Sequence, residues 1–437
     1  MVASDGTSAP GTVPLDLSWH REAPRALVVV HAGHLWDGLG PHLRDNVDIT
    51  ISGRRIQKIE PHRDGLQSGA EVIDASDLTV LPGLWEAHNH GYGGLAGFGD
   101  RAGRIWLAYG FTELQSQGDS AYGALEIKES FGARARVGPR YFAAGEPIDG
   151  ERGYYAGDHG VTNSKELQLE LGRAQALEYD NLKTYVRLPH ELQYEALKFA
   201  HEKLGIWAAS HYGLPGTLYG MDGMTHISAT SRWGYSYTRS TGGTTYDDIR
   251  KLFVAGSEFI ISTPFAASAL YAEDPKILDD PRIATLNTPW EQRTMVAARD
   301  QPAGAGRGGR GGGGAAGLQK EEEALLAVLH SGGTVILGTD SPLAGLAILN
   351  HLGLRAEVKY GFQPWEALQT ATILPAKALG YAKDLGSVEA GKLADLVFVA
   401  GEPLKDIKDV AKVQRVMVDG RVYTIPELMA PFARGTP

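Results

Sequence analysis

The chain of 437 residues contains no cysteine. Without cysteine there can be no disulfide, no thiolate metal site and no cysteine nucleophile, so any metal must be held mainly by histidine, aspartate or glutamate. Positive charge is also scarce, since 42 Lys and Arg stand against 52 Asp and Glu, a formal net charge of −10. Nucleic-acid-binding domains usually carry a basic patch. The chain has no run of Lys or Arg, so we expect no nucleic-acid partner.

Long hydrophobic runs are missing as well. No stretch approaches the roughly 18 consecutive apolar residues that mark a membrane-spanning helix. The first 25 residues lack the basic start and apolar centre of a secretory signal peptide. We therefore expect a cytoplasmic protein with no membrane partner, in which residues 1–25 form a flexible arm.

Two β-rich segments flank a longer α/β segment. Short β-branched stretches interrupted by Gly, Asn and Asp occupy residues 26–81, and similar stretches occupy residues 385–437. Between them, over residues 82–384, short apolar runs alternate with helix-like stretches, a pattern typical of a (β/α)8 TIM barrel. We predict an α/β fold in which such a barrel is joined to a small β-sandwich built from both ends of the chain.

Eight strands are expected in the barrel, at residues 84–90, 111–116, 140–146, 181–188, 206–213, 224–228, 258–265 and 334–341. A low-complexity Gly-rich stretch, residues 303–316, lies between the last two of them. The loop after a barrel strand opens onto the catalytic face. The stretch is therefore either a tolerated surface loop or a mobile lid over the substrate.

Potential metal ligands fall at or near the carboxyl ends of these strands, where barrel active sites are built. They are His88, His90, Lys183, His211, His226 and Asp340. Taken alone, each has an ordinary interpretation, because a lone strand lysine usually faces solvent and an aspartate in a segment such as GTDSP often caps or turns a chain. A single His-x-His pair is also a weak signal. The occurrence of all of them, in order, on barrel strands favours a metal site.

Alternation along the strand at residues 181–188 places Lys183, Tyr185 and Arg187 on one face. We expect Tyr185 and Arg187 near the mouth of the barrel as candidate substrate contacts. An arginine there could bind a substrate carboxylate through two parallel hydrogen bonds. Three further candidates for the mouth are Tyr212, Arg232 and Tyr235.

These motifs make the chain similar to the amidohydrolase superfamily. The resemblance is carried by LPGLWEAHNH, KTYVRL, GMDGMTHIS, ILGTDSP and the tail GSVEAGKLADLVFV, and it extends from about residue 26 to the end of the chain. Many members carry Asp before the histidine pair, whereas this chain has Glu86. The difference affects one contact to the metal ligands and leaves the ligand set unchanged. The chain also resembles the amidohydrolases of natural-product biosynthesis that trim the follower peptide from bottromycin-type ribosomal precursors.

The resemblance implies a site for two divalent metal ions. The histidine pair of the first strand and Asp340 would bind one ion, the other two histidines would bind the second, and Lys183, carboxylated by carbon dioxide, would bridge both. Zinc suits such nitrogen and oxygen ligands best. The implied reaction is hydrolysis of an amide or peptide bond, in which a metal-bridging hydroxide attacks the carbonyl and Asp340 acts as the proton shuttle.

Other functions remain open for the same fold. The chain could be a deaminase or cyclic-amide hydrolase acting on a small heterocycle, or a mycotoxin-type amidase. Heterocycle deaminases of this kind typically hold one metal, lack the strand-four lysine and place a glutamate just after the strand-five histidine, whereas His211 is followed by Tyr212 and Gly213. A third possibility is a metal-binding scaffold without catalysis. The complete ligand set argues against the scaffold.

Overall fold

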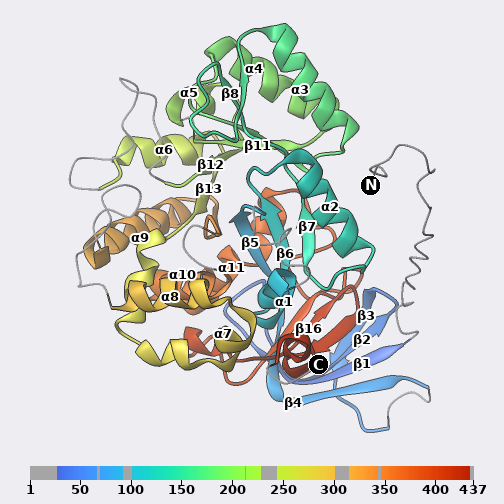
Figure 1. Cartoon of the computed structure of the whole chain (residues 1–437). Helices are drawn as coiled ribbons and strands as arrows, with labels where there is room; N and C mark the ends of the chain where they lie inside the picture. The colour runs from blue at the N-terminus through green and yellow to red at the C-terminus, as the bar shows by residue number, and fades with distance from the viewer. Residues whose placement is uncertain are drawn as a thin grey trace, which may run out of the picture.

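The structure is a computed structural model that describes residues 27–65, 69–91, 101–211, 213–227, 244–300, 314–342 and 346–433. The side chains of residues 213–215 and of residue 314 are outside this description. The expected N-terminal arm and residues 303–313 of the Gly-rich stretch also lie outside it. Within these ranges the fold has two regions, a mostly antiparallel sheet and a set of parallel strands surrounded by helices (Figure 1).

Strands from both β-rich segments of the sequence pair in one seven-stranded sheet, ordered β17-β16-β15-β4-β1-β2-β3. Neighbours pair antiparallel except β1 and β4, which are parallel. The strands are β1 (Val28–Leu35), β2 (Arg44–Ser52), β3 (Arg55–Pro61), β4 (Glu71–Pro82), β15 (Leu396–Val399), β16 (Val413–Val418) and β17 (Arg421–Thr424).

This sheet folds over so that its two ends meet. A Cβ atom at Gly420, in the turn between β16 and β17, would lie 2.4 Å from the carbonyl oxygen of Gly53, in the turn between β2 and β3. An isolated bridge between Arg55 and Leu393 links the same ends. The inward-facing valine, leucine and isoleucine side chains fill one buried core between the two halves. The predicted small β-sandwich is therefore the form this region takes.

The parallel strands occur at the positions that the sequence predicts. One of them, β6, has the predicted length, and the others are shorter than predicted. They are β5 (Leu84–Asn89), β6 (Phe111–Ser116), β7 (Arg140–Phe142), β10 (Asn181–Thr184), β11 (Trp207–Ser210), β12 (Gly223–Thr225), β13 (Phe259–Ser262) and β14 (Val335–Leu337). Among the described residues their ladders form two sheets, β5-β6-β7 and β14-β13-β12-β11-β10-β8-β9, and not one closed barrel. The short strands β8 (Ile148–Gly150) and β9 (His159–Val161) complete the second sheet.

The two sheets follow one another around a ring. The amide of Asp340 donates to the carbonyl oxygen of His88 at 2.7 Å, which joins the end of β14 to β5. On the opposite side, the amide of Asp180 donates to the carbonyl oxygen of Ala143 at 2.9 Å, which joins the start of β10 to the end of β7. The predicted α/β architecture, a TIM-barrel-like arrangement with an attached sandwich, is confirmed.

Helices cover the outside of the parallel strands (Figure 1). They are α1 (Arg101–Ala108), α2 (Ala121–Gly132), α3 (Ser164–Ala176), α4 (His190–Phe199), α5 (Gly213–Leu218), α6 (Asp247–Ala255), α7 (Pro281–Leu286), α8 (Pro289–Arg299), α9 (Gly314–His330), α10 (Ile348–Lys359), α11 (Pro364–Thr370) and α12 (Ile373–Ala378), with α13 (Ile425–Met429) after β17. Local sequence sets several boundaries. At α8, Thr288 and Glu291 form a reciprocal capping box before Pro289, an arrangement that stabilises a helix start by about 1 kcal/mol.

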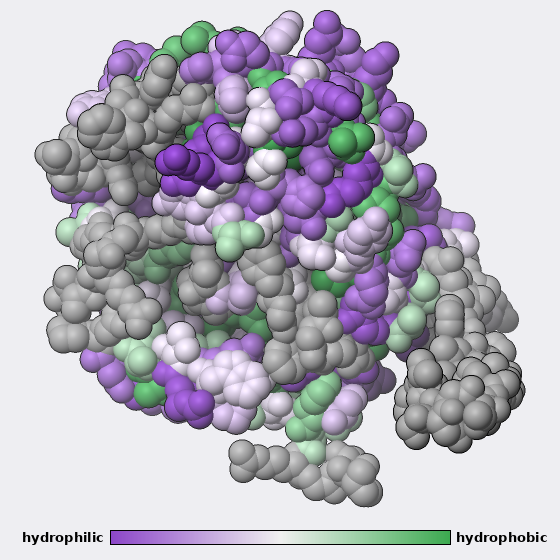
Figure 2. Space-filling model, turned by 45° about the horizontal axis from the view of Figure 1, so that its top comes forward, coloured by the Kyte–Doolittle hydropathy of each residue, from purple (hydrophilic) through white to green (hydrophobic). Residues whose placement is uncertain are grey.

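Hydrophilic residues dominate the outer surface over α3 and α4, while hydrophobic residues are seen mainly in recesses (Figure 2). This matches the buried faces of the two helices, which include Leu167, Leu171, Ala196 and Leu197. In the part of the chain that the structure covers, no helix combines the length and the apolar character needed to cross a membrane.

Candidate metal centre

All six candidate ligands lie at the carboxyl ends of the parallel strands. His88 is in β5 and Lys183 in β10, His211 and His226 directly follow β11 and β12, and the remaining two are His90, just after β5, and Asp340, three residues after β14. Five of the side chains are buried, and the sixth, His90, is 12% exposed. Short apolar runs form the buried strands, so the polar residues at their ends converge at one end of the ring.

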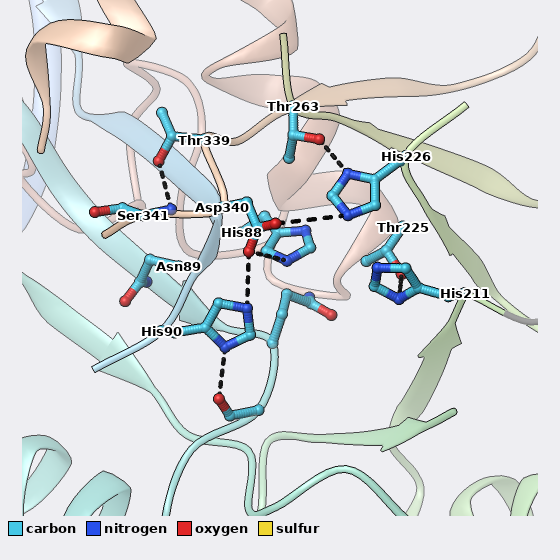
Figure 3. Close-up of polar contacts among 12 residues, drawn as sticks. His88, Asn89, His90, His211, Thr225, His226, Thr263, Thr339, Asp340 and Ser341 are labelled. Carbon is cyan, nitrogen blue, oxygen red and sulfur yellow. Dashed lines mark hydrogen bonds and ion pairs between the residues drawn. The ribbon is translucent and has the colours of Figure 1, made fainter. Parts of the chain in front are cut away.

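The carboxylate of Asp340 lies among three imidazoles (Figure 3). Its Oδ1 atom is 2.9 Å from Nε2 of His90 and 3.3 Å from Nε2 of His88. Its Oδ2 atom is 3.8 Å from Nε2 of His226. One ligand atom each from His88, His90 and Asp340 lie within 4.8 Å of one another. Imidazole nitrogens and carboxylate oxygens are preferred ligands of zinc-like cations, so these three residues could share one ion.

Hydroxyl groups orient the other half of the cluster. The ring centroids of His211 and His226 are 4.7 Å apart. Oγ1 of Thr225 lies 2.8 Å from Nδ1 of His211 and accepts a hydrogen bond from Nζ of Lys183 at 2.9 Å. The hydroxyl of Thr263 is hydrogen-bonded to Nδ1 of His226. Contacts to the Nδ1 atoms leave each Nε2 atom available, as the outer contacts of metal-ligating histidines do.

Buried ring nitrogens test whether the cluster suits a metal ion. Nδ1 and Nε2 of His88 and Nε2 of His226 are buried and make no hydrogen bond to any described group. Leaving a buried polar atom unsatisfied costs about 1–3 kcal/mol, which a bound cation would offset. Burial holds the pKa of His88 well below its usual range and lowers the pKa of His226 to about 4. These rings are therefore neutral, the form that ligates metals, and the donor set fits a divalent cation.

Lys183 is buried, and no described carboxylate lies within ion-pair distance of its Nζ atom, although the charges of Asp340 and Asp158 act on it from farther away. Besides Thr225, its Nζ atom contacts only Oε1 of Gln117, at 3.4 Å, and among the described residues no carboxylate forms an ion pair with it. Burial lowers the pKa of Lys183 to about 7. An unpaired buried ammonium is unfavourable, whereas a neutral amine is a nucleophile. The environment thus favours the form of Lys183 that can combine with carbon dioxide.

Hydrogen bonds of Glu86 connect β5 to the residues that follow β14, next to the candidate ligands. The carboxylate of Glu86 accepts hydrogen bonds from the amide of His88 (2.7 Å), the amide (3.0 Å) and hydroxyl (2.8 Å) of Thr339, and Nδ2 of Asn350 (2.6 Å). A Cβ atom at Gly338 would lie 2.6 Å from Cβ of His88, so only glycine permits this approach. Glu86, whose side chain is longer than the aspartate expected at this position, therefore accepts two hydrogen bonds at each of its oxygens and connects β5 to β14.

Two members of the cluster have strained backbones. His226 and Asp340 adopt φ values of 68° and 58°. This left-handed region is uncommon for residues other than glycine, and such residues persist where the surrounding structure holds them, often at functional sites. The strain aims both side chains towards the cluster at the point where their strands have ended.

A cavity of about 490 Å³ lies beside the cluster. Its volume is within the range of small-ligand sites. Four candidate ligands form part of its wall, namely His90, Lys183, His211 and Asp340. The cluster thus faces a space that can hold a substrate.

The structure brings one expected substrate contact to this cavity. Tyr185 lines the wall, and its ring centroid is 4.6 Å from that of His211. The positions expected at Tyr212, Arg232 and Tyr235 lie outside the described residues.

Arg187 does not line the described cavity with Lys183 and Tyr185, whereas alternation along the strand predicts that it would. Strand β10 ends at Thr184, so the alternating pattern stops before residue 187. Nη1 of Arg187 donates to the carbonyl oxygens of Arg152 (2.6 Å) and Gly153 (2.8 Å), and the residue does not line the described cavity. Its guanidinium is hydrogen-bonded to the loop between β8 and β9, and a substrate contact by Arg187 stays a prediction.

Several residues of the cavity wall were not predicted from the sequence. Gln117 and Asp119 line the wall just after β6, so the rule that sites form at strand ends would have found them. Tyr155 and Asp158 also line it, from the loop between β8 and β9. That loop has no periodic pattern that would have marked either residue.

A second group of potential ligands, His31, Asp48 and His62, lies in the antiparallel sheet. The two imidazole rings are stacked, with centroids 3.7 Å apart and planes 2° apart. Lone pairs of ring nitrogens lie in the ring planes, so two parallel stacked rings cannot both point at one ion unless a ring rotates. The barrel cluster, whose rings meet at larger angles, is the better organised of the two.

Comparison with known proteins shows which family the chain is similar to. A family model described as the amidohydrolase family matches residues 219–423, which include His226 and Asp340. A crystal structure of a Xaa-Pro dipeptidase with bound methionine in the active site superposes with a TM-score of 0.67, covering 91% of this chain and 100% of that chain at 21% identity. The A. niger ochratoxinase structure superposes with a TM-score of 0.65 over 92% and 96% of the two chains at 16% identity. Identities this low show the shared fold alone, and together with the family match they confirm the resemblance to amidohydrolases.

Curated relatives match over short segments. An adenine deaminase of Moorella thermoacetica is 45% identical over 74 residues, which are 17% of this chain and 11% of the relative. An imidazolonepropionase of Shouchella clausii is 35% identical over 113 residues, 24% of this chain and 25% of the relative. The chain therefore spans only a small part of the length of these relatives.

Proposed function

We propose that this chain, which matches the amidohydrolase family and shares its fold, is a metal-dependent hydrolase that cleaves the carbon–nitrogen bond of an amide or peptide. The observation that carries the proposal is the convergence of four histidines, one aspartate and one unpaired buried lysine beside a cavity. Such a ligand set is suited to holding divalent cations at a substrate site.

The residues would divide between two ions. His88, His90 and Asp340 would hold the first, His211 and His226 the second, and carboxylated Lys183 would bridge them. Zinc is the metal that best suits these nitrogen and oxygen ligands. When bound, divalent cations activate water at neutral pH and polarise a substrate carbonyl.

Asp340 is the residue we assign to proton transfer. Burial opposes ionisation, but the neighbouring His88 and His90 hold the pKa of Asp340 well below its usual range, so the side chain is an ionised carboxylate. The carboxylate would take the proton of the attacking water at one Oδ atom and deliver it to the leaving nitrogen. Its burial keeps that proton away from bulk solvent.

The cavity limits what the site can enclose. A volume of about 490 Å³ would hold a segment about the size of a dipeptide. A longer substrate, such as the follower peptide of a modified ribosomal precursor, would place only the residues around its cleaved bond inside. The Xaa-Pro dipeptidase among the structural neighbours supports including dipeptides in a substrate screen.

A second candidate function is attack on a carbon–nitrogen bond of a small heterocycle. The local matches to an adenine deaminase and an imidazolonepropionase favour it. The unpaired buried Lys183 favours amide hydrolysis by a two-metal site instead. Release of ammonia from a purine, with no cleavage of any amide, would support this alternative.

The test is the metal content of protein purified without chelator, measured by elemental mass spectrometry, followed by a screen of amides, dipeptides, cyclic amides and purines. We expect about two divalent ions per chain. His88→Asn and His211→Asn should each lower the metal content, whereas His330→Asn, which changes a histidine on the exterior of α9, should not. A protein that takes up no metal on reconstitution would contradict the proposal.

A further inference from the structure

The wall of the cavity is acidic. Its described lining residues include one lysine, Lys183, and no arginine. The carboxylates in the same wall are those of Asp119, Glu146, Asp158 and Asp340. The described part of the site therefore offers no arginine for a carboxylate of the substrate, and negative charge prevails beside the cluster.

Two of the carboxylates outside the metal cluster already have hydrogen-bond or ion-pair partners within the protein. Asp119 accepts hydrogen bonds from the amide of Gly91 (2.5 Å) and the hydroxyl of Tyr141 (2.6 Å). Glu146 forms an ion pair with Arg173 at 2.8 Å. Neither carboxylate needs a ligand to satisfy it.

Asp158 is different. Its Oδ2 atom accepts a hydrogen bond from the amide of Tyr155 at 2.7 Å, and no cationic side chain within the described ranges forms an ion pair with it. Burial, together with the negative charge of nearby Asp149, raises the pKa of Asp158 to about 7, although the charges of Lys183 and Arg187 act in the opposite direction. A cation in the cavity beside this carboxylate would offset both effects.

Aromatic side chains stand next to Asp158. The ring centroids of Tyr155 and Tyr185 are 5.5 Å apart with planes at 58°, and both residues line the cavity. The hydroxyl of Tyr185 is buried and has no hydrogen-bond partner among the described residues, although the residue is only 2% exposed. Tyrosine faces attract cations, and a buried hydroxyl in a cavity wall is suited to meeting a polar ligand.

Hydrogen bonds of Asp149 and Arg187 hold the loop that carries Asp158. The carboxylate of Asp149 accepts hydrogen bonds from the amides of Tyr154 (2.8 Å) and Arg187 (2.6 Å). Arg187 in turn donates to the carbonyl oxygens of Arg152 and Gly153. These contacts pre-organise the loop, so Asp158 needs little further ordering to bind a ligand.

We infer that Asp158 and the rings of Tyr155 and Tyr185 bind a positively charged group of the substrate, an ammonium or a guanidinium. This inference rests on the proposed function, because it names the class of amide or peptide that the site selects. The cleaved bond lies at the metal cluster, and the cationic group lies across the same cavity against Asp158. The residue is thus assigned to specificity and not to bond cleavage.

Paired substrates that differ only in the charged group test the inference. We would compare Nα-acetyl-lysine p-nitroanilide with Nα-acetyl-norleucine p-nitroanilide, and acetylglycyl-lysine amide with acetylglycyl-norleucine amide, which place the ammonium on either side of the cleaved bond. For the metal-loaded enzyme we expect kcat/KM to favour lysine by roughly 10-fold or more in at least one pair. Asp158→Asn should reduce this preference to within about 3-fold and leave the norleucine substrate nearly unchanged.

The asparagine variant keeps an acceptor for the amide of Tyr155, so the loop should stay folded. Glu151→Gln is the matched control, because it removes an exposed carboxylate from the same loop and should keep the full preference. A lysine preference that is equal in Asp158→Asn and the parent enzyme, or no preference in the parent enzyme, would overturn the inference.

Binding separates this inference from the proposed function. Benzyltrimethylammonium has no lone pair for a metal and carries a fixed charge, so its binding reports on the cation subsite alone. Calorimetry should show at least 10-fold weaker binding to Asp158→Asn than to the parent protein or to Glu151→Gln. Such binding without turnover of any amide would retain the cation subsite and reject amide hydrolysis, whereas equal binding to all three proteins would reject the subsite.

Discussion

Nε2 of His90 lies 2.9 Å from Oδ1 of Asp340, and the backbone amide of Asp340 donates to the carbonyl oxygen of His88. The side chain and the backbone of Asp340 are therefore both tied to the first barrel strand, although about 250 residues separate them in sequence. This double attachment fixes the carboxylate at the junction of β14 and β5. A group so fixed can move a proton over a short, defined distance.

Replacing Asp340 with Asn tests its role. The amide oxygen can still face the imidazoles, so we expect the metal content to fall by less than half, but the variant has no basic oxygen to take up a proton. Turnover should fall by roughly 10²–10⁴-fold, the usual contribution of general acid–base catalysis. Elemental mass spectrometry and kcat on the best substrate of the screen would check both statements.

The control for this variant is Asp64→Asn, which changes a fully exposed carboxylate in the antiparallel region. It should keep both metal and activity. Near-normal turnover of Asp340→Asn would show that the proton moves by another route.

Lys183 should make activity depend on carbon dioxide. Its buried amine forms no ion pair with a described carboxylate and has a lowered pKa, so carbamate formation would replace an unfavourable ammonium with an anion suited to bridging two cations. We expect apoprotein reconstituted with zinc to recover several-fold more activity in bicarbonate buffer than in buffer freed of carbon dioxide. Lys183→Ala should lose most activity and show no response to bicarbonate.

A short carboxylate such as propionate offers a further check on Lys183→Ala. It would fill the space left by the side chain and restore part of the activity if an anion is what the site requires. Equal recovery of the unmodified protein with and without bicarbonate would count against the carbamate.

Most of the framework was accessible from the sequence because strong local signals specify it. The strand β11 is a short apolar run that ends in a polar residue, while β5 and β6 mix apolar and polar residues and also end in polar ones. The candidate ligands were found because each lies in such a strand or shortly after it. The sequence does not show that the strand ladders fall into two sheets, because that depends on how the segments between β7 and β10 pack.

Arg187 and Asp158 show where such reasoning stops. Alternation predicts a shared face only while the strand continues, and β10 ends at Thr184. Asp158 lies in an irregular loop, so its place in the cavity wall follows from tertiary contacts of Asp149 and Arg187 that no local pattern encodes. Specificity residues on loops are the part of a site that the sequence conceals most.

Glu86 should support both the fold and the metal cluster. Burial raises the pKa of Glu86 to about 8, but all four of its hydrogen bonds come from donors and favour the ionised form. The amide group of Glu86→Gln would therefore turn its own donor towards at least one of them. We expect a loss of about 2–3 kcal/mol in the free energy of unfolding, measured by urea denaturation. Because the amide of His88 is one of the donors, zinc affinity should fall as well.

The comparison variant is Glu191→Gln, at an exposed position in the first turn of α4. Its stability should change by less than about 0.5 kcal/mol. If Glu86→Gln is as stable as Glu191→Gln, the carboxylate does not carry the contact between β5 and β14.

Glu258 should make stability fall as pH rises. The side chain is 1% exposed, one oxygen accepts a hydrogen bond from the hydroxyl of Thr217 at 2.6 Å, and the other has no partner among the described residues. Burial raises the pKa of Glu258 from 4.5 to about 8. The folded state thus holds this proton more tightly than the unfolded state, and the stability that the neutral acid contributes is lost between about pH 4.5 and pH 8. The slope is at most roughly 1.4 kcal/mol per pH unit.

Glu258→Gln removes the titration and keeps an acceptor for Thr217. Other groups titrate equally in both proteins, so the difference between their unfolding free energies at pH 5, 6, 7 and 8 isolates Glu258. The unfolding free energy of the glutamine variant, relative to that of the parent protein, should rise steadily across this window. At pH 8 the variant should be the more stable of the two. Parallel curves would mean that Glu258 ionises in the folded protein as easily as in the unfolded chain, through water or motion that reaches its buried oxygen.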